Sequence, residues 1–296
     1  LSGDSDEPLV ISTTGTSGAV KKIEIPREVL LATSIAANKY LGAKPDDIWS
    51  LLLPTNHIAG INVLTRAYLL GTEVVTVKEV ANFSAIVPTQ LFSALNGDDE
   101  LLKHLKSCNK VLVGGAKLSE ALLKKGLEAG INVVTSYGAT ETCGGCVFDG
   151  TPLEGVEIQI NSGLIEIRIA GLNSGNWISL NDLGEIKDGK LIVNGRADDV
   201  FISGGENLSL NLIEEFLQNN YPSQEIYPLS IPDSKWGEAL AIISDQEFPT
   251  TLDQDISEKL GKLYIPKYRK IVAQIPLIGI GKLDRKSLSE LFLINE

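Results

Sequence analysis

The chain has 296 residues, 43% of them hydrophobic, and its formal net charge at pH 7 is −12. This length accommodates two domains with a substantial buried core, and the hydrophobic content excludes an intrinsically disordered chain. The negative charge excludes nucleic acid or an anionic membrane as the main partner, and no apolar run reaches the length of a membrane span. With three cysteines, an odd number, we expect a protein of the reducing cytoplasm. The sequence does not decide the oligomeric state, and a homo-oligomer is possible.

The first candidate site is a loop that follows a strand-like run near the start of the chain, ISTTGTSGAVKK at residues 11–22. Its glycines let backbone N–H groups approach a ligand closely, its hydroxyl groups add donors, and a lysine adds positive charge. These features predict a phosphate-binding loop, although a solvated loop of small residues has the same composition. The spacing of Gly15 and Gly18 excludes a Walker-type loop.

Helix-like and strand-like runs alternate between residues 27 and 136. The apolar spacing predicts helices at residues 27–41, 60–71, 98–107 and 119–130. Apolar runs bounded by turn residues predict strands at residues 48–54, 72–77, 110–115 and 132–138. Such alternation is typical of a mostly parallel sheet covered by helices, in which ligands bind at the carboxyl ends of the strands.

The pattern changes after about residue 150 to short, alternating, turn-punctuated runs, which predict an antiparallel β subdomain. A polar, glycine-rich segment, GRADDVFISGGENLS, then precedes about a hundred residues with both helix-like and strand-like runs. A unit of that size and composition is an α+β domain. We therefore predict an α/β protein with two domains, residues 1–196 and residues 197–296.

Polar and glycine residues gather where predicted strands end. They are the segments GGA at residues 114–116, SYGATET at 136–142, NDLGE at 181–185, GRADD at 195–199 and IGIGKLDR at 278–285. The C-G-G-C spacing of Cys143 and Cys146 suggests either metal or redox chemistry or ordinary thiols in a pocket or core. Because no second Cys/His pair is present, the ordinary thiols are the favoured interpretation.

Taken in order, these segments resemble the adenylate-forming enzymes, the family of acyl-CoA synthetases, peptide-synthetase adenylation domains and luciferases. TTGTSGAVKK resembles their phosphate loop, PTNHIAG the segment whose histidine lies between nucleotide and acyl pocket, and YGATETC the motif that contacts adenine and phosphate. NDLGE resembles the ribose-binding segment, GRADDVFISGGEN the hinge and thiolation loop, and PLIGIGKLDR the stretch with the catalytic lysine. The resemblance covers residues 11–288; the phosphate loop departs from the family at Thr14, Val20 and Lys22, where serine, proline and glycine are usual.

The resemblance implies a large AMP-binding domain and a small mobile C-terminal domain. It also implies small-molecule partners, with ATP and CoA as co-substrates and Mg²⁺ as the cofactor. It assigns ATP binding to Thr13, Thr14, Gly15, Thr16, Ser17, Gly18, Lys21, Gly115, Ala116, Tyr137, Gly138, Thr140, Asp182 and Arg196. It assigns catalysis to Lys282 and His57, Mg²⁺ to Glu141, the hinge to Asp198, and the passage of CoA to Gly204 and Gly205. Plainer alternatives remain: a surface acid at 141, a core tyrosine at 137, and an ion pair between residues 182 and 196.

Within the family, GGAKLS, ETCGGCVFDGTPLEGVEI and NVLTRAYLLG resemble the o-succinylbenzoate–CoA ligases of menaquinone biosynthesis. That acid carries two carboxylates, and an arginine fork at Arg66, in an otherwise apolar helical run, would hold the one that does not react. Pairing of Arg66 with an internal acid, or exposure of its tip to solvent, is the alternative. The alternative functions are ligation of another aryl or fatty acid, and a shortened adenylate-binding module without turnover. The family carries more sequence before the phosphate loop and this chain has no methionine, so we expect either upstream residues or a reduced enzyme.

Overall fold

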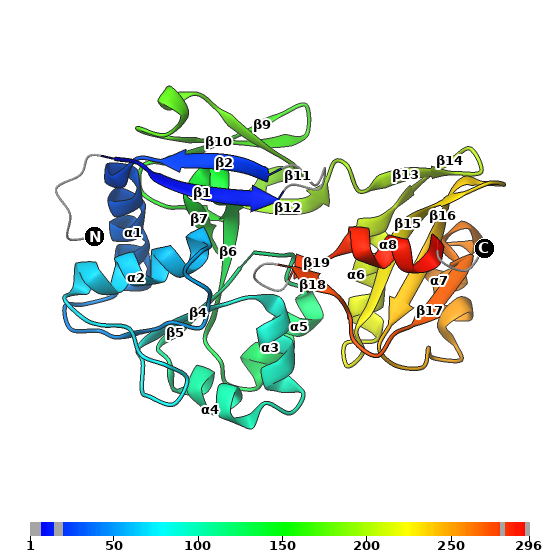
Figure 1. Cartoon of the computed structure of the whole chain (residues 1–296), viewed down its shortest axis with the longest axis horizontal. Helices are drawn as coiled ribbons and strands as arrows, with labels where there is room; N and C mark the ends of the chain where they lie inside the picture. The colour runs from blue at the N-terminus through cyan, green and yellow to red at the C-terminus, as the bar shows by residue number, and fades with distance from the viewer. Residues whose placement is uncertain (1–6, 15–19, 279–281, 294–296) are drawn as a thin grey trace. The chain divides into compact units, whose positions relative to one another are not determined.

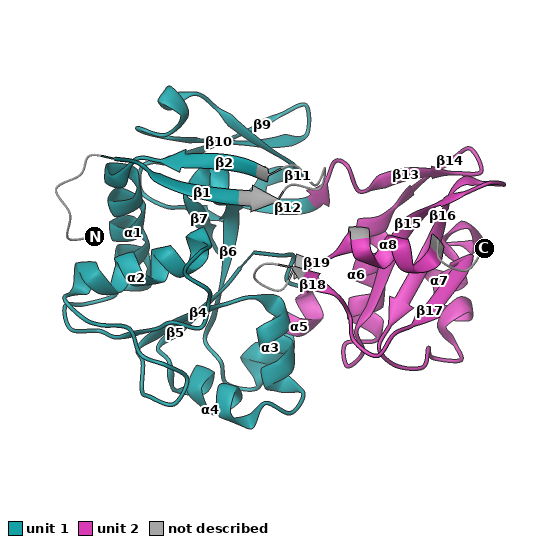
Figure 2. Ribbon diagram, in the orientation of Figure 1, with its two compact units in different colours: residues 1–118, 123–194 teal, residues 119–122, 195–296 magenta. Residues whose placement is uncertain are grey.

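The computed structural model describes residues 7–14, 20–278 and 282–293, and the chain divides into two compact units (Figure 2). Unit 1 comprises residues 1–118 and 123–194, and unit 2 comprises residues 119–122 and 195–296. Over the described ranges, no helix combines the length and the apolar character that crossing a membrane requires.

The centre of unit 1 is a six-stranded sheet with the strand order β3-β4-β5-β6-β7-β8 (Figure 1). Strands β3 to β6 pair in parallel, and β7 and β8 extend the sheet in antiparallel pairing. The strands are β3 (Trp49–Ser50), β4 (Phe83–Ile86), β5 (Lys110–Val113), β6 (Val133–Ala139), β7 (Gly144–Phe148) and β8 (Thr151–Pro152). The helices among them are α1 (Arg27–Leu41), α2 (Ile58–Leu70), α3 (Pro88–Leu95), α4 (Asp99–Ser107) and α5 (Glu120–Glu128). The predicted α/β architecture is confirmed.

One strand predicted for this unit is wrong, and one of its helices is not predicted. Residues 72–77 do not form a strand: Val75 alone makes an isolated bridge to Ser50, beside β3. This segment follows Gly71, the left-handed C-cap residue of α2, and ends in a turn. In the turn, the Glu79 carboxylate accepts hydrogen bonds from the Thr76 N–H and hydroxyl. The turn therefore overrides the strand propensity of its valines and threonines. The other miss is α3, an eight-residue helix that begins at a proline and was not predicted.

The predicted antiparallel subdomain is confirmed as a four-stranded sheet in the order β12-β11-β10-β9. Its strands are β9 (Val156–Asn161), β10 (Leu164–Ile169), β11 (Ile178–Lys187) and β12 (Lys190–Arg196). The segment before α1 forms a separate antiparallel pair, β1 (Leu9–Thr14) with β2 (Val20–Ile25). The candidate phosphate loop, residues 11–22, includes the end of β1, the start of β2 and residues 15–19, which lie outside the described residues.

Unit 2 is built around a sheet in the order β14-β13-β16-β15, with β17 added to β16 in parallel. Its elements are β13 (Val200–Ser203), β14 (Glu206–Ser209), α6 (Leu210–Asn220), β15 (Ile226–Asp233), β16 (Gly237–Ser244), α7 (Leu252–Lys259), β17 (Tyr268–Ile271), β18 (Leu277–Ile278), β19 (Lys282–Leu283) and α8 (Arg285–Leu293). Side chains of β16 alternate between two cores: Leu240 and Ile242 join the core of α6 and α7, and Ala241 joins the core of α8. Because β16 is covered on both faces, its central residues, 239–243, form an uninterrupted apolar run.

A buried polar chain links α4 to the central sheet of unit 1. His104 lies with its Nε2 2.9 Å from the hydroxyl of Ser50, which lies 2.9 Å from the hydroxyl of Ser84. The other ring nitrogen, Nδ1, is 3.1 Å from the carbonyl oxygen of Glu79, which can only accept. The neutral ring with its proton on Nδ1 therefore fits this site, and burial lowers the pKa of His104 because it disfavours the charged ring.

His104 is expected to make the stability of unit 1 depend on pH. Its folded pKa lies below the unfolded value, so its contribution is complete above that unfolded value and is lost as the pH falls through the folded pKa. The urea midpoint of the native chain should fall between about pH 7.5 and about pH 5.5 by more than that of His104→Gln, which cannot titrate. His57→Gln serves as the matched control, and equal pH dependence in the native chain and His104→Gln would contradict the assignment.

Candidate functional site

Two of the predicted nucleotide residues are joined directly. The hydroxyl of Tyr137, on β6, donates a hydrogen bond of 2.7 Å to a carboxylate oxygen of Asp182, on β11. Both side chains are half-buried, so each keeps part of its surface open. A tyrosine ring and a carboxylate held together in this way offer a stacking face for a base beside an acceptor for hydroxyl groups.

The chain then turns sharply between β6 and β7. Gly138 has a φ of 152°, and a Cβ there would lie 2.1 Å from the carbonyl oxygen of Gly144, so only glycine fits. A short 3₁₀ turn, η1 (Thr140–Thr142), follows, and the hydroxyl of Thr142 caps it by accepting a 2.8 Å hydrogen bond from the Ala139 N–H. Thr142 is fully buried, and its hydroxyl also donates a 3.0 Å hydrogen bond to the Gly144 carbonyl oxygen.

The turn presents Glu141 to Lys21. Their Oε1 and Nζ atoms are 3.4 Å apart, although 120 positions separate the residues in the chain. The side chains are 32% and 64% exposed, so solvent screens the pair and the two groups are available to a ligand. A phosphate would suit the ammonium group, and a divalent cation would suit the carboxylate.

The donor set fits a magnesium ion that arrives with a nucleotide. Among the described residues, no group of three or more His, Cys, Asp or Glu side chains could hold a metal by itself. Mg²⁺ is usually bound by one or two carboxylates together with substrate phosphates and waters, without a cage made only of protein ligands. The single carboxylate of Glu141 matches that pattern.

The phosphate loop itself falls largely on undescribed residues. Thr13 and Thr14 lie on the backbone of β1, where Thr13 is paired in register with Lys21. The side chains of these two threonines, and the whole of Gly15, Thr16, Ser17 and Gly18, lie outside the described residues. Of the loop residues assigned to ATP, Lys21 has a side chain among those that the structure describes, and it lies beside Glu141.

The glycine-rich segment after β5 lies at the same edge of the sheet as Tyr137. Strands β5 and β6 are parallel neighbours, so residues that follow them meet at their carboxyl ends. Gly114 packs on β6, where an added Cβ would be 3.1 Å from the Cβ of Ser136. Gly115 and Ala116 follow, both exposed, with Gly115 at a φ of 80°. Exposed positions without bulky side chains leave room for a flat ligand beside Tyr137.

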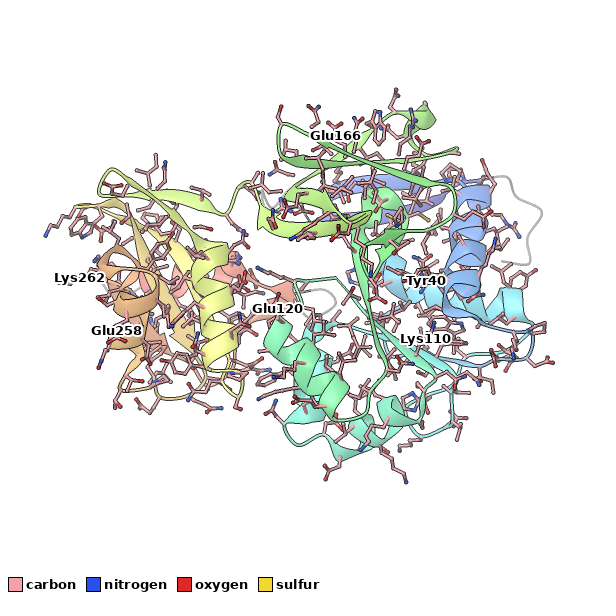
Figure 3. The ribbon with its side chains drawn as sticks, turned by 180° about the vertical axis from the view of Figure 1, so that it is seen from behind. Tyr40, Lys110, Glu120, Glu166, Glu258 and Lys262 are labelled. Atoms are coloured by element: carbon pink, nitrogen blue, oxygen red, sulfur yellow. The ribbon has the colours of Figure 1, made fainter. Side chains whose placement is uncertain are left out.

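Helix α2 carries both candidate residues of the acyl pocket. His57 occupies the N-cap position with a half-buried side chain, and Arg66 lies in the second half of the helix, 4% exposed. The guanidinium of Arg66 lies 5.3 Å from the ring centre of Trp49 and 5.9 Å from that of Phe148. Tyr40 packs edge-on against Phe148; it is labelled in Figure 3 together with Lys110, whose Nζ lies 6.0 Å from the tyrosine ring.

Arg66 is a buried cation without an acidic partner in the part of the chain that the structure describes. Its Nε has no hydrogen-bond partner there, and no salt bridge to its guanidinium is formed. Burial lowers the pKa of Arg66 to about 10, which leaves it charged at neutral pH. Among the described residues, no acid therefore pairs with Arg66, and little of its side chain reaches solvent.

The cysteines near Arg66 are core thiols. Cys143 and Cys146 are both buried, and burial raises their pKa values to about 11 and about 12 because the thiolate is poorly solvated there. The Thr33 hydroxyl makes a long hydrogen bond of 3.5 Å to the sulfur of Cys143. Neutral thiols of this kind are poor nucleophiles and poor metal ligands, in keeping with the favoured interpretation from the sequence.

Unit 2 carries the other predicted residues. Arg196 makes a two-point ion pair with Asp198, with distances of 2.7 Å from Nε and 3.0 Å from Nη2. Gly204 and Gly205 form the two-residue turn between β13 and β14, with φ values of 60° and 90° that favour glycine. Lys282 lies on the backbone of β19, paired in register with Ile278, and its side chain lies outside the described residues.

Sequence reasoning missed Asn62, which ties α2 to the turn after β6. Its side-chain amide donates a 2.9 Å hydrogen bond to the carbonyl oxygen of Cys143, and it is 3% exposed. A signal was present, since an asparagine on the apolar side of a helix, four residues before Arg66, needs a partner. Which partner it finds depends on how the helix packs.

Comparison with known proteins identifies the family. The family model described as AMP-binding enzyme matches residues 3–196. A Mycobacterium tuberculosis protein named "Probable 2-succinylbenzoate–CoA ligase" is 30% identical, and the match covers 98% of this chain and 85% of that protein. The 2-succinylbenzoate–CoA ligase of Staphylococcus epidermidis is 29% identical, with 94% and 69% covered.

A solved structure gives the same picture of the fold. The o-succinylbenzoate CoA synthetase (MenE) of Bacillus subtilis, in complex with the acyl-adenylate intermediate OSB-AMP, matches with a TM-score of 0.77. It is 25% identical, and the match covers 94% of this chain and 68% of that chain. With the family model matched over most of the chain, and with relatives aligned along nearly all of it, the chain belongs to the AMP-binding enzyme family.

Proposed function

We propose that this chain is an ATP-dependent 2-succinylbenzoate–CoA ligase of menaquinone biosynthesis, acting in the cytoplasm. The acid's carboxylate would attack the α-phosphorus of ATP to give acyl-AMP and pyrophosphate, and the CoA thiol would then displace AMP to give the thioester. One observation carries the adenylation step: β6 and the turn after it place Tyr137 beside Asp182 and Glu141 beside Lys21. The named relatives support the choice of acid.

Each of these residues has a part in the first half-reaction. Tyr137 would stack on adenine, Asp182 would accept hydrogen bonds from the ribose hydroxyls, and Lys21 would bind the β- and γ-phosphates. Negative charges crowd together in this step, so preorganised cations and donors lower its barrier. Mg²⁺ bound by Glu141 would neutralise phosphate charge, and His57 would lie between the nucleotide and the acid.

The acid's second carboxylate is the group that we assign to Arg66. A buried, charged guanidinium between two aromatic rings can form two parallel hydrogen bonds to a carboxylate, which a lysine cannot. No acidic side chain among the described residues pairs with Arg66, so the second carboxylate of a diacid would supply the missing anion.

Acid-dependent exchange of pyrophosphate into ATP, followed by thioester formation with CoA, tests the proposed function. We expect exchange with 2-succinylbenzoate to exceed exchange with benzoate, anthranilate and medium-chain fatty acids. A stronger exchange with another acid would identify that acid as the substrate and would leave the proposed adenylation and thioester formation unchanged. Binding of ATP without exchange for any acid would leave the chain as an adenylate-binding module.

The second half-reaction requires CoA to reach the acyl-AMP, so we infer that residues 197–296 act as a mobile domain about Asp198. Rotation would withdraw Lys282 and bring the loop with Gly204 and Gly205 to the adenylate, where the absence of side chains lets the pantetheine arm pass.

Asp198→Pro is expected to impair thioester formation more than adenylation, because proline fixes φ at the pivot. Asp198→Ala is the matched control, since it removes the carboxylate that pairs with Arg196 and leaves φ free. Both half-reactions are measured on each variant, with acyl-AMP supplied for the second. Parallel losses in Asp198→Pro would place the pivot elsewhere.

A further inference from the structure

The hydrogen bond between Asn62 and Cys143 connects two parts of the site that lie far apart in the chain. Asn62 is in α2, between the two candidate residues of the acyl pocket, and Cys143 ends the η1 turn that carries Glu141. The bond is 2.9 Å long, and the asparagine side chain is 3% exposed, so water does not compete with it.

The backbone around Cys143 depends on this contact. Cys143 is in the left-handed conformation, with a φ of 59°, which is unfavourable for a residue with a side chain. Gly144 follows at a φ of 89°, and a Cβ there would lie 2.4 Å from the Asn62 Nδ2 atom. The amide is therefore packed directly on the backbone of the turn, and it supplies the donor for the Cys143 carbonyl.

Hydrogen bonds among residues 139–143 also hold the η1 turn. Cys143 N–H donates to the Thr140 carbonyl oxygen at 3.1 Å, and the Thr142 hydroxyl binds the Ala139 N–H. These bonds, with that from the Thr142 hydroxyl to the Gly144 carbonyl oxygen, join η1 to the adjoining ends of β6 and β7, and its position against other elements depends on further contacts. Asn62 supplies such a contact from α2 at the residue next but one to Glu141.

We propose that Asn62 is a positioning residue for the nucleotide and its magnesium ion, acting through the η1 turn that carries Glu141. This inference rests on the proposed function, in which Glu141 binds Mg²⁺. Asn62 lies in the helix of the acyl pocket, four residues before Arg66. Its hydrogen bond, however, is made to the turn that carries Glu141, on the nucleotide side of the site. A defect at Asn62 should therefore weaken use of MgATP and spare use of the acid.

Asn62→Asp keeps the shape of the side chain and turns the donor into an acceptor that faces the Cys143 carbonyl. We expect the KM for MgATP and the Mg²⁺ concentration for half-maximal exchange to rise about tenfold, corresponding to about 1.4 kcal/mol. The KM for 2-succinylbenzoate should stay near that of the native chain. The rise in melting temperature that MgATP produces without acid should shrink in parallel, which reports binding independently of turnover.

Thr65→Val is the matched control, because Thr65 is also buried on α2 and its hydroxyl donates a 2.9 Å hydrogen bond to the Ile61 carbonyl oxygen of the same helix. It should leave both KM values unchanged. If the buried carboxylate prevents Asn62→Asp from folding, Asn62→Leu, neutral and of similar volume, takes its place. An unchanged response of the Asn62 variant to MgATP would overturn the inference, as would equal losses for MgATP and acid. A native chain that MgATP does not stabilise would instead contradict the proposed function.

Discussion

Replacement of Lys282 by alanine is expected to lower acid-dependent adenylation by about 10²–10³, the usual effect of removing one preorganised electrostatic contact from a reaction centre. In the proposed mechanism its ammonium group lies against the acid's carboxylate and the α-phosphate, where negative charge develops as the two react. The lysine would stabilise that charge and orient the attack without taking a proton. Its backbone lies in β19, at the end of a hairpin just before α8.

The test measures both half-reactions on one folded variant. Thioester formation from supplied acyl-AMP should survive Lys282→Ala, because that step would use the other orientation of the small domain. Lys262→Ala, which changes an exposed lysine of the same unit on η3 (Lys262–Tyr264), controls for loss of surface charge. If Lys282→Ala adenylates the acid as fast as the native chain, Lys282 has no part in the mechanism. If both half-reactions are slowed equally, the two steps do not use different orientations of the small domain.

The order of elements was predictable because it depends on local patterns. Amphipathic spacing located α1 and α2, and the two apolar faces of β16 gave an uninterrupted apolar run. The wrong strand at residues 72–77 had strand-like residues, but the chain turns at Thr76, where the Glu79 side chain binds the backbone. That competition between a turn and a strand depends on a single side chain, which composition does not reveal.

The site was predictable as a set of residues and not as an arrangement. Motif resemblance named Lys21 and Glu141 separately, but their contact, across 120 positions, follows from the folding of β2 beside η1. The same holds for the aromatic surroundings of Arg66, since Trp49 lies outside every segment of the resemblance and no segment predicts that Phe148 packs near the guanidinium. Long-range packing decides such contacts, and a single sequence carries no direct record of it.

Arg66→Ala is expected to raise the KM for 2-succinylbenzoate by about 10- to 100-fold, because a charge-assisted hydrogen bond is lost, while the KM for ATP changes far less.

The burial of Arg66 also leads to a prediction for the stability of the fold. A charge held 4% exposed without an acidic partner among the described residues costs folding free energy. Arg66→Met, which keeps the length of the side chain and removes the charge, should therefore unfold at a urea concentration equal to or higher than the native chain.

The decisive comparison varies the acid as well as the protein. If Arg66 binds the carboxylate that does not react, an analogue of 2-succinylbenzoate without that group should be used equally by the native chain and by Arg66→Met. An analogue that keeps both carboxylates should show the full penalty, and the ratio of the two effects isolates the arginine–carboxylate interaction from general damage to the pocket. Arg66→Lys keeps the charge without the planar fork and should recover part of the affinity. A penalty of the same size for both acids, together with a lower urea midpoint for Arg66→Met, would make Arg66 a structural residue of the aromatic core.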